Sequence, residues 1–346
     1  MTTGILTFHD GINYGAFCQV YSLFSYLRSQ GLDVQVLNYK NPGFEERERQ
    51  CFILPGNAEL TARNMRKMAL FEEVHSLLNM TPRLRSQEDL ARHAFDAVVV
   101  GSDEVWNFST ELIGFDPVYF SHGVQAERLV SYAPSFGTVN AGDAIPEAVC
   151  EGIRRFSSIS VRDANASRVV QGITGTAAPI VLDPTFLTDL SAQAVLPEEK
   201  DYILVYGFFT PPMVESIRGY ARKTGKKTVA LGYYRDWCDV NRDIITPFEW
   251  LGYFMQSDCV VTTMFHGMIY SILNRKPFCM FMTDYRRNKV GTLLDDAGLV
   301  HAIAGEHDDP AAVLSGHFDY AAAYASIDAK RAFSRQYLAQ ALGLPL

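Results

Sequence analysis

Short apolar runs alternate with amphipathic segments along this chain. Near the start, an apolar run at residues 5–8 precedes a Gly/Asn loop, a helix-like segment at 16–30 and a second apolar run at 34–39. Gly31 stands where a residue in the left-handed conformation typically ends a helix. This order predicts one β-α-β unit at the start of the chain.

Four further apolar runs follow a segment of helical pattern at residues 58–93. They read "FDAVVVGSD", "RLVSYAPSFG", "SSISVRD" and "PIVLDPTF", and each ends in a polar, Gly- or Pro-containing turn. Buried parallel strands have continuous apolar sequences, and loops at their carboxyl ends build ligand sites. The sequence therefore predicts a mainly parallel sheet with a site at that edge.

The same pattern restarts near residue 202. "YILVYGF" and "KTVALGY" predict strands, and Pro211 and Gly225 can open and close a helix between them. A helix at 247–256, a strand in "PFCMFM" and helices in "NKVGTLLDDAGL" and "SIDAKRAFSRQYLAQALG" follow. We expect an α/β protein of two Rossmann-like domains that face a cleft. The expected domains are residues 1–190 and 191–330, with residues 331–346 as a terminal helix that packs on the first domain.

Composition limits the functional class. The chain has 346 residues, 48% hydrophobic and 20% charged, which suits two globular domains. Its formal net charge of -8 argues against a nucleic-acid or anionic-membrane surface, because both need a basic field. An anionic ligand would need a local cluster of cations.

Six scattered cysteines without a CxxC pair predict reduced thiols. "GILTF" after Met1 is too short for a signal peptide, and no apolar run reaches the roughly 18 residues of a membrane span. We therefore expect a cytoplasmic protein without an integral membrane segment.

The stretch "SDCVVTTMFHGMIYSILNRKPF" places His266 and Gly267 between a strand-like and a helix-like segment. A histidine at this hinge either takes part in chemistry or only hydrogen-bonds at a helix start, and the positive end of the helix favours a bound anion beside it. No second His or Cys stands nearby at metal-binding spacing, so we expect no metal.

Two other strand-to-helix turns carry polar candidates. "GINYGA" offers Asn13, Tyr14 and Gly15, whose backbone N–H groups could hold an anion or a hydroxyl, unless the turn only needs unusual dihedrals. "VVVGSDEVWN" offers Asp103 to take a proton from a sugar hydroxyl and Trp106 to stack on a sugar. The alternative there is a helix cap and a core tryptophan.

Cations follow two of the predicted strands. Arg162 in "SVRD" can bind a carboxylate or phosphate bidentately, or pair structurally with Asp163 or Asp183. "YRRNK" supplies three cations that suit phosphate or form a solvated loop.

The ordered set of motifs carries a resemblance. "GINYGA", "GSDEVWN", "SYAPSFG", "SVRD", "LDPTF", "YILVYGF", "FHGMIYSILNRKPF" and "NKVGTLLDDAGL" resemble the polysaccharide pyruvyl transferase family, from about residue 4 to 300. The resemblance implies a glycosyltransferase-B-like fold. It also implies transfer of a pyruvyl group from phosphoenolpyruvate, as a ketal, to a saccharide of a surface glycan, without a further cofactor.

Site residues follow from this resemblance. It implies that Arg162 holds the donor and that His266 is the general acid or a phosphate partner, while Asp103 as general base is our own inference. The remaining donor-side residues would be Gly267, Arg286, Arg287 and Lys289. The acceptor side would comprise Asn13, Tyr14, Gly15, Ser102, Asp103, Trp106 and Asn107.

One position departs from the family. Some members carry a basic residue two positions before the histidine, where this chain has Met264. Two alternatives stay open: a glycosyltransferase of the same fold with a nucleotide-sugar donor, and a sugar-binding module without activity. The acceptor could be a lipid-linked or nucleotide-linked precursor or the polymer, and the sequence does not specify the sugar or the oligomeric state.

Overall fold

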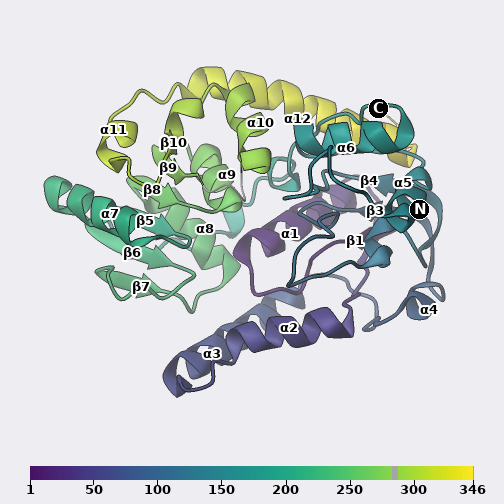
Figure 1. The fold of residues 1–346 in the computed structure, drawn as a ribbon, viewed down its shortest axis with the longest axis horizontal. Coiled ribbons are helices and arrows are strands. Elements are labelled where there is room, and N and C mark those ends of the chain that lie inside the picture. The colour runs from purple at the N-terminus through teal and green to yellow at the C-terminus, as the bar shows by residue number, and fades with distance from the viewer. Residues whose placement is uncertain (283–286, 346) are drawn as a thin grey trace. The chain divides into compact units, whose positions relative to one another are not determined.

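The computed structural model describes residues 1–282 and 287–345, without the side chains of residues 287–289, and shows two compact units (Figure 1). The first unit comprises Met1–Asp189 and Ala329–Leu346, and the second comprises Leu190–Asp328. The first boundary falls after residue 189, against 190 from the sequence, and the terminal segment of the first unit begins at 329, against 331.

The first unit contains a four-stranded parallel sheet of order β2-β1-β3-β4. Its strands are β1 (Thr2–Leu6), β2 (Asp33–Val36), β3 (Ala94–Val100) and β4 (Gln125–Ser131). "SSISVRD" and "PIVLDPTF" add only the isolated bridges Val130–Ser158 and Val161–Ile180. Side chains also join the first bridged segment to β4, because the Oγ atoms of Ser131 and Ser160 each donate to the other residue's carbonyl at 2.9 Å, alongside the backbone bonds.

Six α-helices lie between Met1 and Asp189. They are α1 (Tyr14–Ser29), α2 (Pro42–Phe52), α3 (Ala58–His75), α4 (Gln87–Leu90), α5 (Glu147–Arg154) and α6 (Ala164–Thr174), with 3₁₀ turns at Pro117–Phe120 and Pro184–Phe186. The helix predicted over 58–93 is confirmed at α3 and at the short α4, and it is wrong for residues 76–86 between them. There the chain runs extended beside the β2 segment and bridges Val36 to Met80 and Tyr39 to Leu84.

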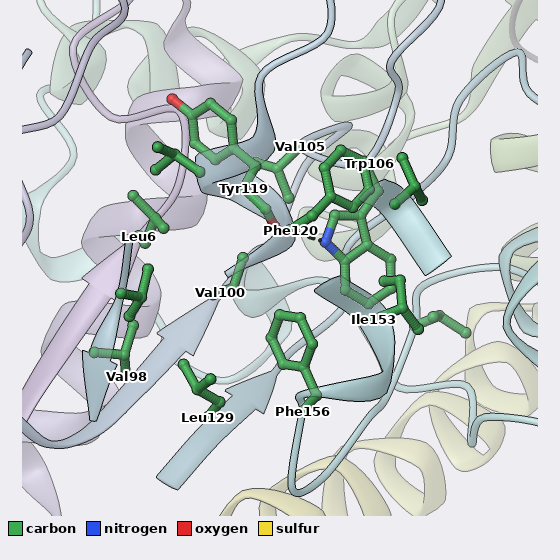
Figure 2. Packing of buried hydrophobic residues seen from close by; sticks show 14 of the residues in the cluster. Leu6, Val98, Val100, Val105, Trp106, Tyr119, Phe120, Leu129, Ile153 and Phe156 are labelled. Atoms are coloured by element: carbon green, nitrogen blue, oxygen red, sulfur yellow. Dashed lines mark hydrogen bonds between the residues drawn. The ribbon is translucent and has the colours of Figure 1, made fainter. Parts of the chain in front are cut away.

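Two apolar cores lie on the two faces of the sheet, because successive strand residues point to opposite sides. Val98 and Val100 of β3 belong to the core that contains Trp106 and Phe156 (Figure 2). Val99 belongs to the opposite core, with residues of α1 and of the C-terminal helix.

The second unit contains a six-stranded parallel sheet of order β10-β9-β8-β5-β6-β7. Its strands are β5 (Tyr202–Tyr206), β6 (Lys227–Leu231), β7 (Val240–Arg242), β8 (Cys259–Thr262), β9 (Phe278–Phe281) and β10 (Ile303–Ala304). Its helices are α7 (Pro211–Thr224), α8 (Pro247–Gln256), α9 (Phe265–Leu273), α10 (Arg287–Ala297) and α11 (Pro310–Leu314), with 3₁₀ turns at Ser191–Gln193 and Val300–Ala302. The predicted strands β5, β6 and β9 and the predicted helices α7 and α8 are confirmed. If β5 is counted as strand 1, the strand order of this sheet is 6-5-4-1-2-3, which is the order of the doubly wound Rossmann fold.

Helix α12 (Tyr320–Leu342) begins in the second unit and ends in the first (Figure 1). In the second unit, Tyr324 Oη donates to the carbonyl of Leu273 at 2.9 Å. In the first, Tyr337 Oη donates to the carbonyl of Ser131 at 2.9 Å and Arg331 Nε to that of Phe186 at 2.7 Å. None of the helices within the described ranges is long and apolar enough to cross a bilayer.

Candidate functional site

Each unit has one point where the strand order reverses. In the first unit it lies between β1 and β3, and in the second between β5 and β8. Ligands of open parallel sheets bind outside the carboxyl ends of the strands at such points. The residues that follow these four strands are therefore the first candidates for ligand-binding and catalytic roles.

Asp103 follows β3 at the switch point of the first unit. Its backbone is left-handed, with φ 67°, and its carbonyl accepts the N–H of Ser135 at 2.8 Å. Its side chain is 18% exposed; Oδ1 accepts the N–H of Glu104 at 2.8 Å and lies 3.8 Å from Nη2 of Arg162. Asp103 is thus a fixed carboxylate with access to solvent beside a buried cation.

Arg162 is buried and paired with Asp183, one of the two structural pairings that the sequence left open. Its Nη1 lies 2.8 Å from Oδ2 of Asp183, and the two side chains are 3% and 1% exposed. Oδ1 of Asp183 accepts the N–H and the hydroxyl of Thr185 at 3.1 and 2.8 Å. An anionic donor that binds Arg162 would therefore bind a guanidinium group whose positive charge is already paired with the Asp183 carboxylate.

His266 is the second residue of α9, directly beyond β8 at the switch point of the second unit. The turn before it is fixed by Thr262, whose Oγ1 donates to the carbonyl of Tyr206 at 2.7 Å and accepts the N–H of Met264 at 2.9 Å. The His266 ring packs edge-on to Phe265, with centroids 5.3 Å apart, and the residue is 8% exposed. The first turn of a helix favours a bound anion.

Gly267 has a packing reason of its own. A Cβ atom there would lie 2.2 Å from Thr262 Oγ1 and 2.9 Å from Tyr206 Cδ1. Only glycine lets α9 start this close to the ends of β5 and β8. Its contact with the donor stays a prediction.

The turn "GINYGA" has a structural role. Asn13 is the N-cap of α1, and its Oδ1 accepts the N–H groups of Gly15 and Ala16 at 3.0 and 3.3 Å. The cap already occupies the N–H groups of Gly15 and Ala16, so Gly15 does not offer its N–H group to an anion or a hydroxyl. For Asn13 and Tyr14 the acceptor role stays a prediction. The Tyr14 ring packs edge-on against Phe71, with centroids 5.0 Å apart.

Trp106 is also a core residue. It is fully buried, and its Nε1 donates to the carbonyl of Tyr119 at 2.9 Å. The expected stacking on a sugar is wrong because neither ring face is exposed. Asn107 is 2% exposed and donates to Glu104 Oε2 at 2.9 Å, while Ser102 is fully buried beside the carbonyl of Ala133. Neither residue presents a surface to an acceptor.

The side chains of the three cations in "YRRNK" all lie outside the described part of the chain. Arg286 lies outside the described residues. Arg287 and Lys289 stand in the first turn of α10, and their side chains lie outside the described part of the chain. Their role in donor binding stays a prediction.

Comparison with known proteins decides the family. The sequence model of the polysaccharide pyruvyl transferase family matches residues 13–285, and this range includes Asp103, Arg162 and His266. The chain belongs to the polysaccharide pyruvyl transferase family. No curated protein shows significant sequence similarity to it.

Solved structures place this pyruvyl transferase family member in a fold class. UDP-GlcNAc 2-epimerase from Methanocaldococcus jannaschii in complex with UDP-GlcNAc and UDP superimposes with a TM-score of 0.53 at 12% identity, over 97% of this chain and 99% of the epimerase. Another structure of that enzyme gives 0.51 at 11% identity, over the same shares. The likeness concerns the fold alone, and the expected glycosyltransferase-B-like class with two Rossmann-like α/β units is confirmed.

This family member also has an ionic cluster at the sheet edge that the sequence did not reveal. Asp10 follows β1, and its two oxygens lie 3.0 Å from Lys40 Nζ and 2.6 Å from Arg83 Nη1; Lys40 also pairs with Glu48. Burial alone would raise the pKa of Asp10, but the charges of His9, Lys40 and Arg83 outweigh it and hold the pKa well below its usual range. A signal existed, because Asp10 follows its strand as Asp103 follows β3.

A polar bridge joins the two loops of this switch point. Gln19 Nε2 donates to Thr7 Oγ1 at 3.1 Å, and Thr7 Oγ1 donates to the carbonyl of Ser102 at 3.1 Å. All three residues are fully buried. The bridge ties the loop that leads to Asp10 to the loop that leads to Asp103, which suits a preorganised site. Among the described residues, no three His, Cys, Asp or Glu side chains are grouped so that they could hold a metal.

Proposed function

We propose that this protein transfers a pyruvyl group from phosphoenolpyruvate to a saccharide, as a cyclic ketal, in the biosynthesis of a surface glycan. The family match over residues 13–285 carries the proposal. The position of His266 at a switch point of a doubly wound sheet supports it. The six free cysteines suit a reducing compartment, and we propose the cytoplasm as the site of the reaction.

The reaction needs both an acid and a base. Protonation of the CH₂ carbon of phosphoenolpyruvate creates the methyl group and makes C2 electrophilic. One sugar hydroxyl adds to C2 and loses its proton, phosphate leaves with its bonding electrons, and a second hydroxyl adds and loses its proton. The sum is donor plus diol giving ketal plus inorganic phosphate. A positioned acid and a positioned base each contribute about 10²–10⁴-fold to such steps.

We assign the donor side to His266, as general acid or phosphate partner, at the positive end of α9. Arg162 would bind the donor in addition to Asp183, with further cations from Arg286, Arg287 and Lys289. The assignments of His266 and Arg162 rest on the family motifs and on the local geometry of each unit, whereas those of Arg286, Arg287 and Lys289 rest on the sequence alone.

We assign the acceptor side to the sheet edge of the first unit. Asp103 is the partly exposed carboxylate there and would take the hydroxyl proton. Asp10, which Lys40 and Arg83 keep ionised, would accept a hydrogen bond from a second hydroxyl rather than a proton.

The test is incubation of the full chain with phosphoenolpyruvate and candidate saccharides. We expect phosphate release that depends on the acceptor and a new ketal methyl signal in the proton NMR spectrum. His266→Ala should lower the rate at least about a hundredfold. His307→Ala, an exposed histidine of the same unit, is the matched control and should keep the rate.

Two outcomes would overturn the proposal. Release of a nucleotide from a sugar nucleotide, without use of phosphoenolpyruvate, would indicate a glycosyltransferase. Saccharide binding that survives His266→Ala, without turnover of either donor, would indicate a sugar-binding module.

A further inference from the structure

The second unit has a groove along α7 that shares no residue with the switch point. It encloses about 600 Å³ and is lined by Phe209 and Trp237 and by Val214, Glu215, Arg218 and Arg222 of α7. The α7 residues recur at helical spacing, so they form one stripe along the helix. The groove therefore combines aromatic rings with charged groups of both signs.

Its cations are available to a ligand. Arg218 and Arg222 are exposed, and neither forms a hydrogen bond or an ion pair within the described part of the chain. Arg242 of the same unit, by contrast, is paired with Glu199. Glu215 is the one carboxylate among the described residues that line the groove, so the two guanidinium groups leave its lining with a net positive charge. In a protein of net charge -8, such a local excess of cations favours an anionic ligand.

Its aromatic wall is held in place. Phe209 packs edge-on to Trp237, with centroids 5.9 Å apart, and edge-on to Phe281 at 6.4 Å. Trp237 stays partly exposed, and its indole N–H donates to no acceptor among the described residues. A fixed indole with one apolar face and one open donor suits the face and hydroxyl of a sugar ring.

We propose that this groove binds a saccharide that already carries the carboxylate of a pyruvyl ketal. The inference rests on the proposed function, because that reaction produces a sugar chain with such carboxylates. A sugar ring would lie on Trp237, the carboxylate on Arg218 and Arg222, and a hydroxyl on Glu215. The enzyme would thereby retain a partly modified chain between successive transfers.

Binding of three oligosaccharides to the full chain tests the proposal. One carries a single pyruvyl ketal, the second is the same compound after mild acid has removed the ketal, and the third carries a phosphate monoester. Isothermal titration should show about tenfold tighter binding of the ketal compound than of the neutral one, as expected for a charge-assisted contact. The phosphate compound should not bind more tightly than the ketal compound.

Variants locate the binding. The double substitution R218Q and R222Q should abolish the preference for the ketal, and Trp237→Leu should weaken binding of both the ketal and the neutral compound. Lys223→Gln, an exposed residue of α7 that does not line the groove, is the matched control and should change neither. Thermal unfolding of each variant shows that it is folded.

Transfer to a short neutral acceptor separates the two hypotheses. R218Q with R222Q should leave this rate unchanged. If no pyruvyl transfer occurs but the ketal compound still binds selectively, the proposed function is wrong and the proposal that the groove binds the ketal saccharide is supported. Equal affinity for ketal and neutral compounds overturns the groove proposal, and so does tighter binding of the phosphate compound.

Discussion

Met264 stands where the resemblance to the family implies a basic residue in some members. It is the N-cap of α9, forms no side-chain cap hydrogen bond and is partly exposed, two residues before His266. A guanidinium at this position would add a charge-assisted contact to an anionic donor. We expect Met264→Arg to lower KM for phosphoenolpyruvate about tenfold, measured by phosphate release, while Met264→Leu keeps it. An unchanged KM in the arginine variant would show that position 264 does not face the donor.

Replacement of Asp183 tests the structural role of its ion pair with Arg162. Removing one partner of a buried pair leaves an uncompensated charge and costs about 3–5 kcal/mol. Asp183→Asn should therefore lower the free energy of unfolding by about that amount, measured by urea denaturation. Asp103→Asn, at the partly exposed neighbour, should keep most of the stability but lose about a hundredfold in kcat. A stable Asp183→Asn protein would contradict the assignment.

At the scale of elements, the start of α9 depends on the absence of a side chain at Gly267. In Gly267→Ala the new Cβ would overlap Thr262 Oγ1, so the first turn with His266 must shift. We expect a loss of about 1–3 kcal/mol in stability and at least about tenfold in kcat, since catalysis is sensitive to misplacement of this order. Gly172→Ala in α6 is the control, because open space surrounds that position and alanine favours a helix. Retained kcat in Gly267→Ala would exclude the proposed positioning.

The sequence predicted the strand-to-helix hinges well, because each has an apolar run, a turn and a helix start in adjacent residues. It missed α2, in which Phe44 is the only buried residue and the apolar pattern is correspondingly weak. It did not show the break in the helical range 58–93, because the segment between His75 and α4 keeps apolar residues although it runs as an extended chain that bridges to Val36 and Tyr39. Side-chain roles were harder to predict: whether Asn13 caps a helix or Trp106 faces a core depends on neighbours distant in sequence.

For the whole molecule, His75 should make stability depend on pH. Burial lowers its pKa to about 4; Asp10 opposes this shift, and the charges of His9 and Lys40 add to it. The unfolded chain, with a pKa of 6.5 for this group, therefore binds more protons below that pH. The contribution of neutral His75 to the free energy of unfolding is fully present above pH 6.5 and is lost as the pH falls toward 4. The free energy of unfolding should therefore fall by about 2 kcal/mol between pH 7 and pH 5.

Replacement of His75 tests this linkage. Its Nε2 has no hydrogen-bond partner among the described residues and its ring lies near Phe17 and Phe71, so His75→Leu should be tolerated at pH 7. Urea unfolding at pH 7 and pH 5 should show a smaller loss of stability in this variant than in the wild type. His317→Leu, at an exposed histidine, should behave as the wild type. Equal pH dependence in all three proteins would refute the assignment.

Helix α12 also has a consequence for biosynthesis. Leu338, Ala341 and Leu342 pack in the same core as Ile5 and Val130, although residues 190–328 separate them in the chain. On the ribosome, α1 can already cover this face of the first sheet, but the part of the core that α12 completes stays uncovered while the whole second unit is translated. The nascent chain exposes an apolar surface throughout that time, which makes the first unit a natural client of chaperones during its own synthesis.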